Sequence, residues 1–117
     1  LNNKATVLTI SNVEESQASR LAQGNIYLRS GPEIGVASTK TFTCSMEALY
    51  ILSAYLGHLN GFLSEETLRE KLMDLEKLPD KLGKITSDSE SYIKLAELYH
   101  DRSNFLYLGR GINYPIA

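Results

Sequence analysis

The chain has 117 residues, with 12 basic and 14 acidic side chains and a formal net charge of −2. Its hydrophobic share of 43 % and charged share of 22 % are ordinary for a soluble globular domain. There is no basic stripe, so we expect no nucleic-acid partner. No apolar run is long enough to span a bilayer, so we expect no membrane association.

Cysteine and histidine usage argues against disulfides and against a metal centre. Cys44 is the single cysteine, so it can form no internal disulfide, and we expect it to pack in the core. His58 and His100 lie far apart without the spacing of metal ligands. We therefore expect no metal site and a location in the reducing cytoplasm.

Two short strands are predicted near the N-terminus. The β-branched, apolar run 5–10 is typical of a strand that is buried on both faces in a parallel sheet. A short helix within 14–23 and a second strand at 25–28 follow. A loop at 29–39, with two glycines and a proline, then leads to a helix.

The helix that starts at Lys40 carries apolar residues on nearly all its faces, which predicts that it is buried. Gly57 is its expected end residue. The three following helices are expected to begin at three sites: Ser64 as N-cap, Pro79 in the first helical position, and a capping box of Ser87 and Glu90.

A last strand is predicted at 105–108, followed by a glycine loop at 109–111 and the start of a helix at 115–117. The order of elements predicts an α/β fold, a parallel sheet with flanking helices and a helical connector. Leu1 stands directly before a strand, and 115–117 resembles the opening of a helix, so we expect a fragment of a longer chain.

The loop 31–40 is the candidate binding site. Ligands of open α/β sheets bind beyond the carboxyl ends of the strands, and a helix N-terminus offers unpaired N–H groups to an anion. Ser38 and Thr39 add hydroxyls and Lys40 adds a cation, so a phosphorylated or polyhydroxylated ligand would suit this loop. The alternative is that Ser38 is only an N-cap and Lys40 a solvated side chain.

Glu33 lies in the same loop and allows two interpretations. A carboxylate near a ligand can act as a general base. It can also accept hydrogen bonds from the N–H groups of the loop, and this is the interpretation that we favour.

The run 31–43, Gly-Pro-Glu-Ile-Gly-Val-Ala-Ser-Thr-Lys-Thr-Phe-Thr, resembles a characteristic stretch of the glutamine–fructose-6-phosphate aminotransferases. Upstream, 8–13 resembles the strand and turn that precede this stretch in the family. Downstream, 108–111 and 114–117 resemble the start of the family's second sugar-isomerase half. The chain thus resembles an internal fragment of the isomerase part of this family.

The resemblance implies sugar isomerase (SIS) domains, each a flavodoxin-like parallel sheet flanked by helices and here incomplete. The implied division is the C-terminal part of the first SIS domain at 1–57, a helical connector at 58–103, and the start of the second SIS domain at 104–117.

The family converts fructose 6-phosphate, with ammonia released from glutamine, to glucosamine 6-phosphate, and uses no metal or organic cofactor. The resemblance implies as partners a sugar phosphate, the glutaminase domain and second SIS domain of the parent chain, and a second copy of the parent in a homodimer.

Family roles transfer to two positions. The resemblance implies that the hydroxyl of Ser38 and the main-chain carbonyl of Val36 contact the sugar. Thr39 and Lys40 belong to the same motif, with support of the loop as their expected role. The family's phosphate-binding serine loop and its catalytic lysine, glutamate and histidine match nothing in this chain, so we expect the fragment alone to be inactive and to be poorly stable or oligomeric.

Two other functions stay open on sequence. One is a different SIS enzyme, such as a deglycase or a sugar-phosphate isomerase. The other is a non-enzymatic SIS domain that senses a sugar phosphate.

Overall fold

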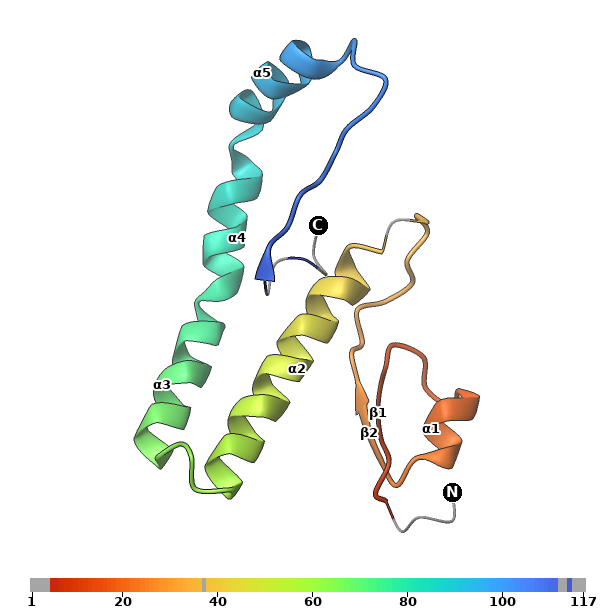
Figure 1. Cartoon of the computed structure of the whole chain (residues 1–117), viewed down its shortest axis with the longest axis vertical. Coiled ribbons are helices and arrows are strands. Elements are labelled where there is room, and N and C mark those ends of the chain that lie inside the picture. Colours follow the sequence, from red (N-terminus) through yellow and green to blue (C-terminus); the bar gives the residue numbers. More distant parts are fainter. Residues whose placement is uncertain (1–4, 37, 112–113, 115–117) are drawn as a thin grey trace. The chain divides into compact units, whose positions relative to one another are not determined.

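The structure, a computed structural model, describes residues 5–36, 38–111 and 114. The chain forms two compact units, Leu1–Glu76 and Lys77–Ala117. Its elements in order are β1 Leu8–Ser11, α1 Gln17–Leu21, β2 Gly24–Tyr27, α2 Lys40–Leu59, α3 Glu65–Glu76, α4 Leu78–Ser87 and α5 Ser89–Tyr99 (Figure 1).

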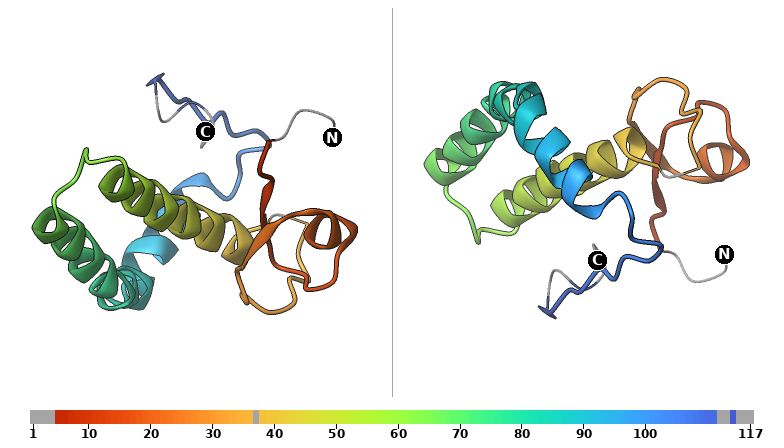
Figure 2. Two further views of the ribbon diagram at one scale, coloured as in Figure 1. Left: turned by 90° about the horizontal axis from the view of Figure 1, so that it is seen from below. Right: turned by 90° about the horizontal axis from the view of Figure 1, so that it is seen from above.

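In the first unit, β1 and β2 pair in parallel, with Leu8 opposite Gly24 (Figures 1 and 2). A Cβ at Gly24 would lie 2.7 Å from the end of the Leu8 side chain, so a larger residue there would require Leu8 to move. The strand predicted at 5–10 begins further along the chain and covers residues 8–11. The Val7 N–H donates to the Gln23 side chain (2.8 Å) instead of to a strand, so the ladder starts after it.

α2 is longer than predicted, because Gly57 lies inside the helix and does not end it. The chain after the helix folds back onto this residue. Phe62 N donates to the Gly57 carbonyl (2.8 Å), and a Cβ at Gly57 would lie 3.2 Å from the side chain of Leu63. The left-handed backbone that ends the helix belongs to Gly61, at φ +76°.

α3 begins as predicted. The Ser64 hydroxyl accepts from Thr67 N at 3.1 Å, which is the N-cap geometry expected for this residue. α3 then packs against α2 as an antiparallel neighbour (Figure 1).

The second unit contains α4 and α5. Pro79 is the second residue of α4 and not the first. The cap of α5 is Asp88, whose carboxylate accepts from Ser91 N at 3.3 Å. The capping box of Ser87 and Glu90 is therefore wrong, because Ser87 is still helical and its hydroxyl donates back to Lys84 O at 2.9 Å.

The predicted strand at 105–108 is not formed within the described part of the chain. A strand is defined by hydrogen bonds to a neighbour, and this segment has no described strand beside it. Phe105 instead makes an edge-on ring contact with Tyr99, at 6.4 Å between centroids. The helix start expected at 115–117 lies outside the described residues.

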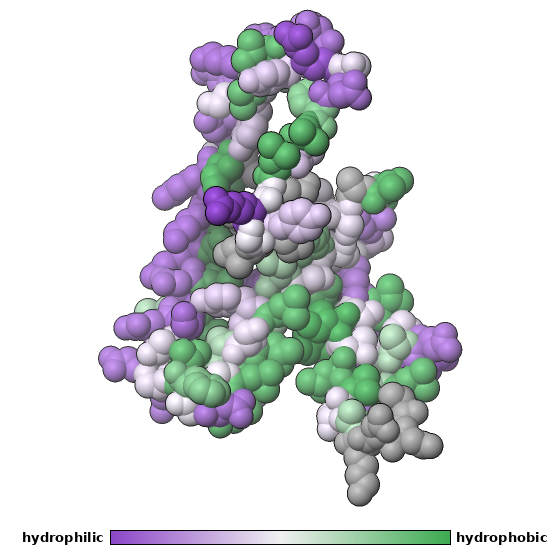
Figure 3. Space-filling view, viewed as in Figure 1, coloured by the Kyte–Doolittle hydropathy of each residue, from purple (hydrophilic) through white to green (hydrophobic). Residues whose placement is uncertain are grey.

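Little of the described chain is buried. Ala54 and Ser19, both 5 % exposed, are the only buried residues among those described. α2 was predicted to be buried, yet its apolar Phe42, Leu49 and Tyr55 are about half exposed, at 45, 49 and 51 %. Figure 3 shows this apolar surface over α2, and the described residues supply too few apolar side chains to cover it.

Of the helices described, none has the length and apolar character needed to cross a membrane.

Candidate functional site

The loop after β2 is held in place by the residue that follows β1. Asn12 Oδ1 accepts from the N–H and the hydroxyl of Ser30, both at 2.9 Å, and its Nδ2 donates to Gly31 O at 2.8 Å. The carboxyl ends of two parallel strands are thus tied together where α/β proteins bind ligands. Sequence reasoning missed Asn12, although an asparagine directly after the first strand was a visible signal.

The carboxylate of Glu33 lies against the first turn of α2. Its Oε1 accepts from Thr39 N at 2.7 Å and Lys40 N at 2.8 Å, and its Oε2 accepts from Thr41 N at 3.3 Å. The N-cap residue Thr39 makes no capping bond with its own side chain. Glu33 therefore provides the acceptor that these unpaired N–H groups require.

The Thr39 hydroxyl also donates to Glu33 Oε1, at 3.4 Å, and two further hydroxyls complete this arrangement. The Ser38 hydroxyl donates to Glu33 Oε2 at 3.0 Å, and the Thr41 hydroxyl donates to the same oxygen. The hydroxyls of Ser38 and Thr41 also contact each other. We call Glu33, the N–H groups of residues 39–41 and these two hydroxyls the Glu33 clamp.

The clamp changes the acidity of Glu33. The bond from the Thr41 hydroxyl is the largest cause that lowers the pKa of Glu33, from 4.5 to about 2. Partial loss of hydration opposes this change, and the bonds from Lys40 N, the Ser38 hydroxyl and Thr39 N add to it. A carboxylate this acidic is a weak proton acceptor at neutral pH, which argues against the general-base interpretation.

The clamp also corrects the expectations for the helix N-terminus. The N–H groups that were expected to be open to an anion are paired with Glu33. Ser38 is not the N-cap, and Lys40 is not merely solvated, because its ammonium donates to Pro32 O at 2.9 Å. An anionic ligand therefore finds no unpaired N–H groups at residues 39–41.

Val36 and Ser38, which the family resemblance places at the sugar, lie on the exposed side of the loop. The side chain of Val36 is fully exposed and that of Ser38 is exposed beside the Glu33 clamp. Residue 37, between them, lies outside the described residues.

Two cavities border α2. One, of about 360 Å³, lies at the start of the helix and is lined by Ser30, Thr39, Lys40, Thr43 and Cys44. Its lining is mostly apolar, although Ser30, Thr39 and Thr43 carry hydroxyls.

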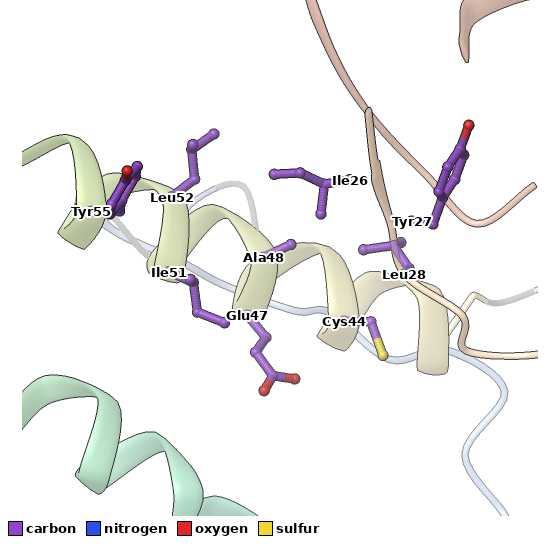
Figure 4. Close-up of a pocket in the computed structure, with 9 residues that line it drawn as sticks. All are labelled: Ile26, Tyr27, Leu28, Cys44, Glu47, Ala48, Ile51, Leu52 and Tyr55. Atoms are coloured by element: carbon purple, nitrogen blue, oxygen red, sulfur yellow. The ribbon is translucent and has the colours of Figure 1, made fainter. Parts of the chain in front are cut away.

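The other cavity, of about 410 Å³, lies between β2 and α2 and is largely apolar (Figure 4). Ile26 and Leu28 point toward the helix, while the ring of Tyr27 points away, as strand alternation requires. The remaining lining residues come from α2: Cys44, Glu47, Ala48, Ile51, Leu52 and Tyr55. Such a lining suits packing of the fold better than a sugar phosphate. Cys44, expected in the core, is half-buried and borders both cavities.

Within residues 5–36, 38–111 and 114, no group of three or more His, Cys, Asp or Glu side chains is arranged to hold a metal ion. Each of the two histidines bonds to a backbone carbonyl near the end of a helix. His58 Nδ1 bonds with Leu63 O at 3.0 Å and His100 Nδ1 with Glu97 O at 2.9 Å.

Comparison with known proteins shows what this chain is similar to. Residues 1–54 match the SIS domain. The glutamine–fructose-6-phosphate aminotransferase (isomerizing) of Gloeobacter violaceus is 44 % identical over 112 residues, covering 95 % of this chain and 18 % of the relative. The chain is homologous to a segment of these aminotransferases. Two further enzymes of the same name are similar to the chain. The one from Tropheryma whipplei is 41 % identical, covering 97 % of this chain and 19 % of the relative, and the one from Thermococcus kodakarensis is 39 % identical, covering 98 % and 19 %.

The chain spans about a fifth of the length of the aminotransferases that it matches. The parallel pair of strands with helices, together with the SIS match, confirms the predicted class, a partial α/β fold of SIS type. No solved structure matches the chain.

Proposed function

We propose that this chain is part of the isomerase region of a glutamine–fructose-6-phosphate aminotransferase. In the whole protein, fructose 6-phosphate and ammonia from glutamine would yield glucosamine 6-phosphate. The observation that carries the proposal is the similarity itself, 37–44 % identity along nearly the whole chain to enzymes that bear this name.

Within this chain, the sugar contacts are the main-chain carbonyl of Val36 and the hydroxyl of Ser38. Their loop follows the carboxyl end of β2, which supports the proposal because ligands of such sheets bind there. Glu33, Thr39 and Lys40 support the loop through the bonds described above. The groups that transfer protons belong to other parts of the parent protein, so the fragment alone does not turn over substrate.

The proposed organisation of the parent follows the family. Residues 1–57 are the C-terminal part of the first SIS domain, 58–103 a helical connector and 104–117 the start of the second SIS domain; the SIS match to residues 1–54 supports the first boundary. The partners are the sugar phosphate, the glutaminase and second SIS domains of the same chain, and a second parent chain in a homodimer. The proposed location is the cytoplasm, and the proposed reaction uses no cofactor.

Ser38→Ala in the full-length protein tests the proposal. The substitution removes one hydroxyl that contacts the sugar, so the dissociation constant for fructose 6-phosphate should rise about tenfold. Titration calorimetry measures the affinity, and glucosamine 6-phosphate formation from glutamine measures the activity. Ser45→Ala is the matched control, because the Ser45 hydroxyl lies within α2 and bonds to Thr41 O at 2.7 Å.

A wild-type protein that neither binds fructose 6-phosphate nor forms glucosamine 6-phosphate would refute the function. Binding by the wild type with an unchanged affinity in Ser38→Ala would remove Ser38 from the site and leave the function standing.

A further inference from the structure

The hydroxyl of Ser38 has one proton and two lone pairs, so its partners in the clamp decide what it can offer to a ligand. Two oxygens lie beside it, Glu33 Oε2 at 3.0 Å and the hydroxyl oxygen of Thr41. The Glu33 carboxylate is ionised at neutral pH, as the lowering of its pKa to about 2 implies, and an ionised carboxylate only accepts.

The position of the Ser38 proton follows from these neighbours. If the proton pointed out of the clamp, a lone pair of Ser38 would face the negatively charged oxygen of Glu33 at 3.0 Å. An inward proton instead bonds to Glu33 or, when Thr41 donates to Glu33, to the hydroxyl oxygen of Thr41. In both inward arrangements the Ser38 oxygen presents a lone pair, and no proton, on its outer side.

We propose that Glu33 is a positioning residue that makes Ser38 a hydrogen-bond acceptor, so that this part of the loop takes a hydroxyl group of the sugar and rejects its phosphate group. A sugar hydroxyl can donate to the outward lone pair, whereas an ionised phosphate has mainly acceptor oxygens. The carboxylate of Glu33 adds charge repulsion against a phosphate, and the N–H groups of residues 39–41 that could bind one are paired. The inference rests on the proposed function, because it takes fructose 6-phosphate as the ligand.

The test is a double-mutant cycle in the full-length protein, with Glu33→Gln, Ser38→Ala and both together. Glutamine keeps the size of the side chain, but its NH₂ group can donate to Ser38 and turn the serine proton outward. Glu33→Gln should weaken the binding of fructose 6-phosphate about tenfold. The double variant should bind no more weakly than Ser38→Ala alone, because Glu33 acts through Ser38.

A residue that merely holds the loop in shape would give additive losses, and additive losses overturn the proposal. An unchanged affinity in Glu33→Gln overturns it as well. Glu47→Gln is the matched control, since it removes an exposed carboxylate that lies on α2 outside the clamp. Its affinity should equal that of the wild type.

A second measurement leaves Glu33 intact, so it holds even if Glu33→Gln fails to fold. Ser38→Ala and the wild type are titrated with inorganic phosphate as well as with fructose 6-phosphate. The variant should lose affinity for the sugar phosphate and keep its affinity for inorganic phosphate. Equal losses for both probes overturn the proposal.

The two proposals fail in distinguishable ways. If the wild type does not bind fructose 6-phosphate, the proposed function fails and takes the inference with it. If the wild type binds, Ser38→Ala weakens binding and Glu33→Gln does not, the inference alone fails.

Discussion

One carboxylate, that of Glu33, accepts bonds from three backbone N–H groups and three hydroxyls at the start of α2. A negative charge in this position also interacts favourably with the positive end of the helix dipole. These contacts favour the ionised form, so the pKa of Glu33 is lower in the folded chain than in the unfolded one. The residue therefore links the stability of the loop to pH.

Ionised Glu33 stabilises the folded loop, so this contribution depends on pH. A lowered carboxyl pKa contributes stability that is complete above the unfolded value of 4.5 and is lost as the pH falls toward about 2. The full-length protein should therefore be more stable than its Glu33→Gln variant at pH 7, and the difference should shrink below pH 4.5. Urea unfolding of both proteins between pH 7 and pH 3 measures it. A difference that stays constant over this range would contradict the prediction.

Sequence alone predicted the loop 31–40 as the candidate site but could not identify every contact in it. The sequence left two roles open for Glu33. Hydrogen-bond distances of about 3 Å decide between these roles, and a sequence pattern does not contain distances. Asn12 was missed because its partners Ser30 and Gly31 are 18 and 19 residues away, while the turn chemistry of an asparagine is local.

Among the elements, α2 shows how local signals compete at a helix end. Periodicity predicted α2, α3 and α5, whose apolar residues recur at helical spacing, whereas α4 was predicted from Pro79 and α1 within a polar stretch. It misplaced the ends at Gly57 and Ser87, because several residues there can serve as caps and the folded contacts choose among them. The prediction of a strand at 105–108 failed for another reason, because strand pairing depends on a partner and not on the segment itself.

Gly61 and Gly57 give a matched pair of substitutions. Gly61→Ala places a side chain on a left-handed backbone with φ +76°, which should cost about 1–2 kcal/mol of stability. Gly57→Ala keeps a helical backbone, and its gain of about 1 kcal/mol in helix propensity is offset by the Leu63 side chain at 3.2 Å. Urea unfolding of the full-length variants should show the larger loss for Gly61→Ala. A larger loss for Gly57→Ala would place the helix end where the sequence first suggested it.

At the scale of the whole molecule, the described chain has more apolar surface than it can cover. Large apolar residues on α2 and α5 are about half exposed, and only Ala54 and Ser19 are buried among the described residues. Buried apolar area is the main favourable term in folding. A chain with so little of it has little to offset the loss of conformational entropy.

The 13.0 kDa polypeptide expressed alone should therefore show no cooperative thermal transition as a monomer. Circular dichroism during heating, with sedimentation to determine the mass, makes the measurement. The full-length protein is the control and should unfold cooperatively. One sharp transition of a monomeric fragment would show that its few buried contacts suffice.

The Glu33 clamp can also form quickly during synthesis of the chain. Its partners Ser38, Thr39, Lys40 and Thr41 lie only five to eight residues from Glu33. Loops of such length close in about 10–100 ns, far faster than the seconds that a ribosome needs to add the same residues. The clamp thus requires no segment after Thr41, and it can guide the start of α2 during synthesis, before the rest of that helix has been added.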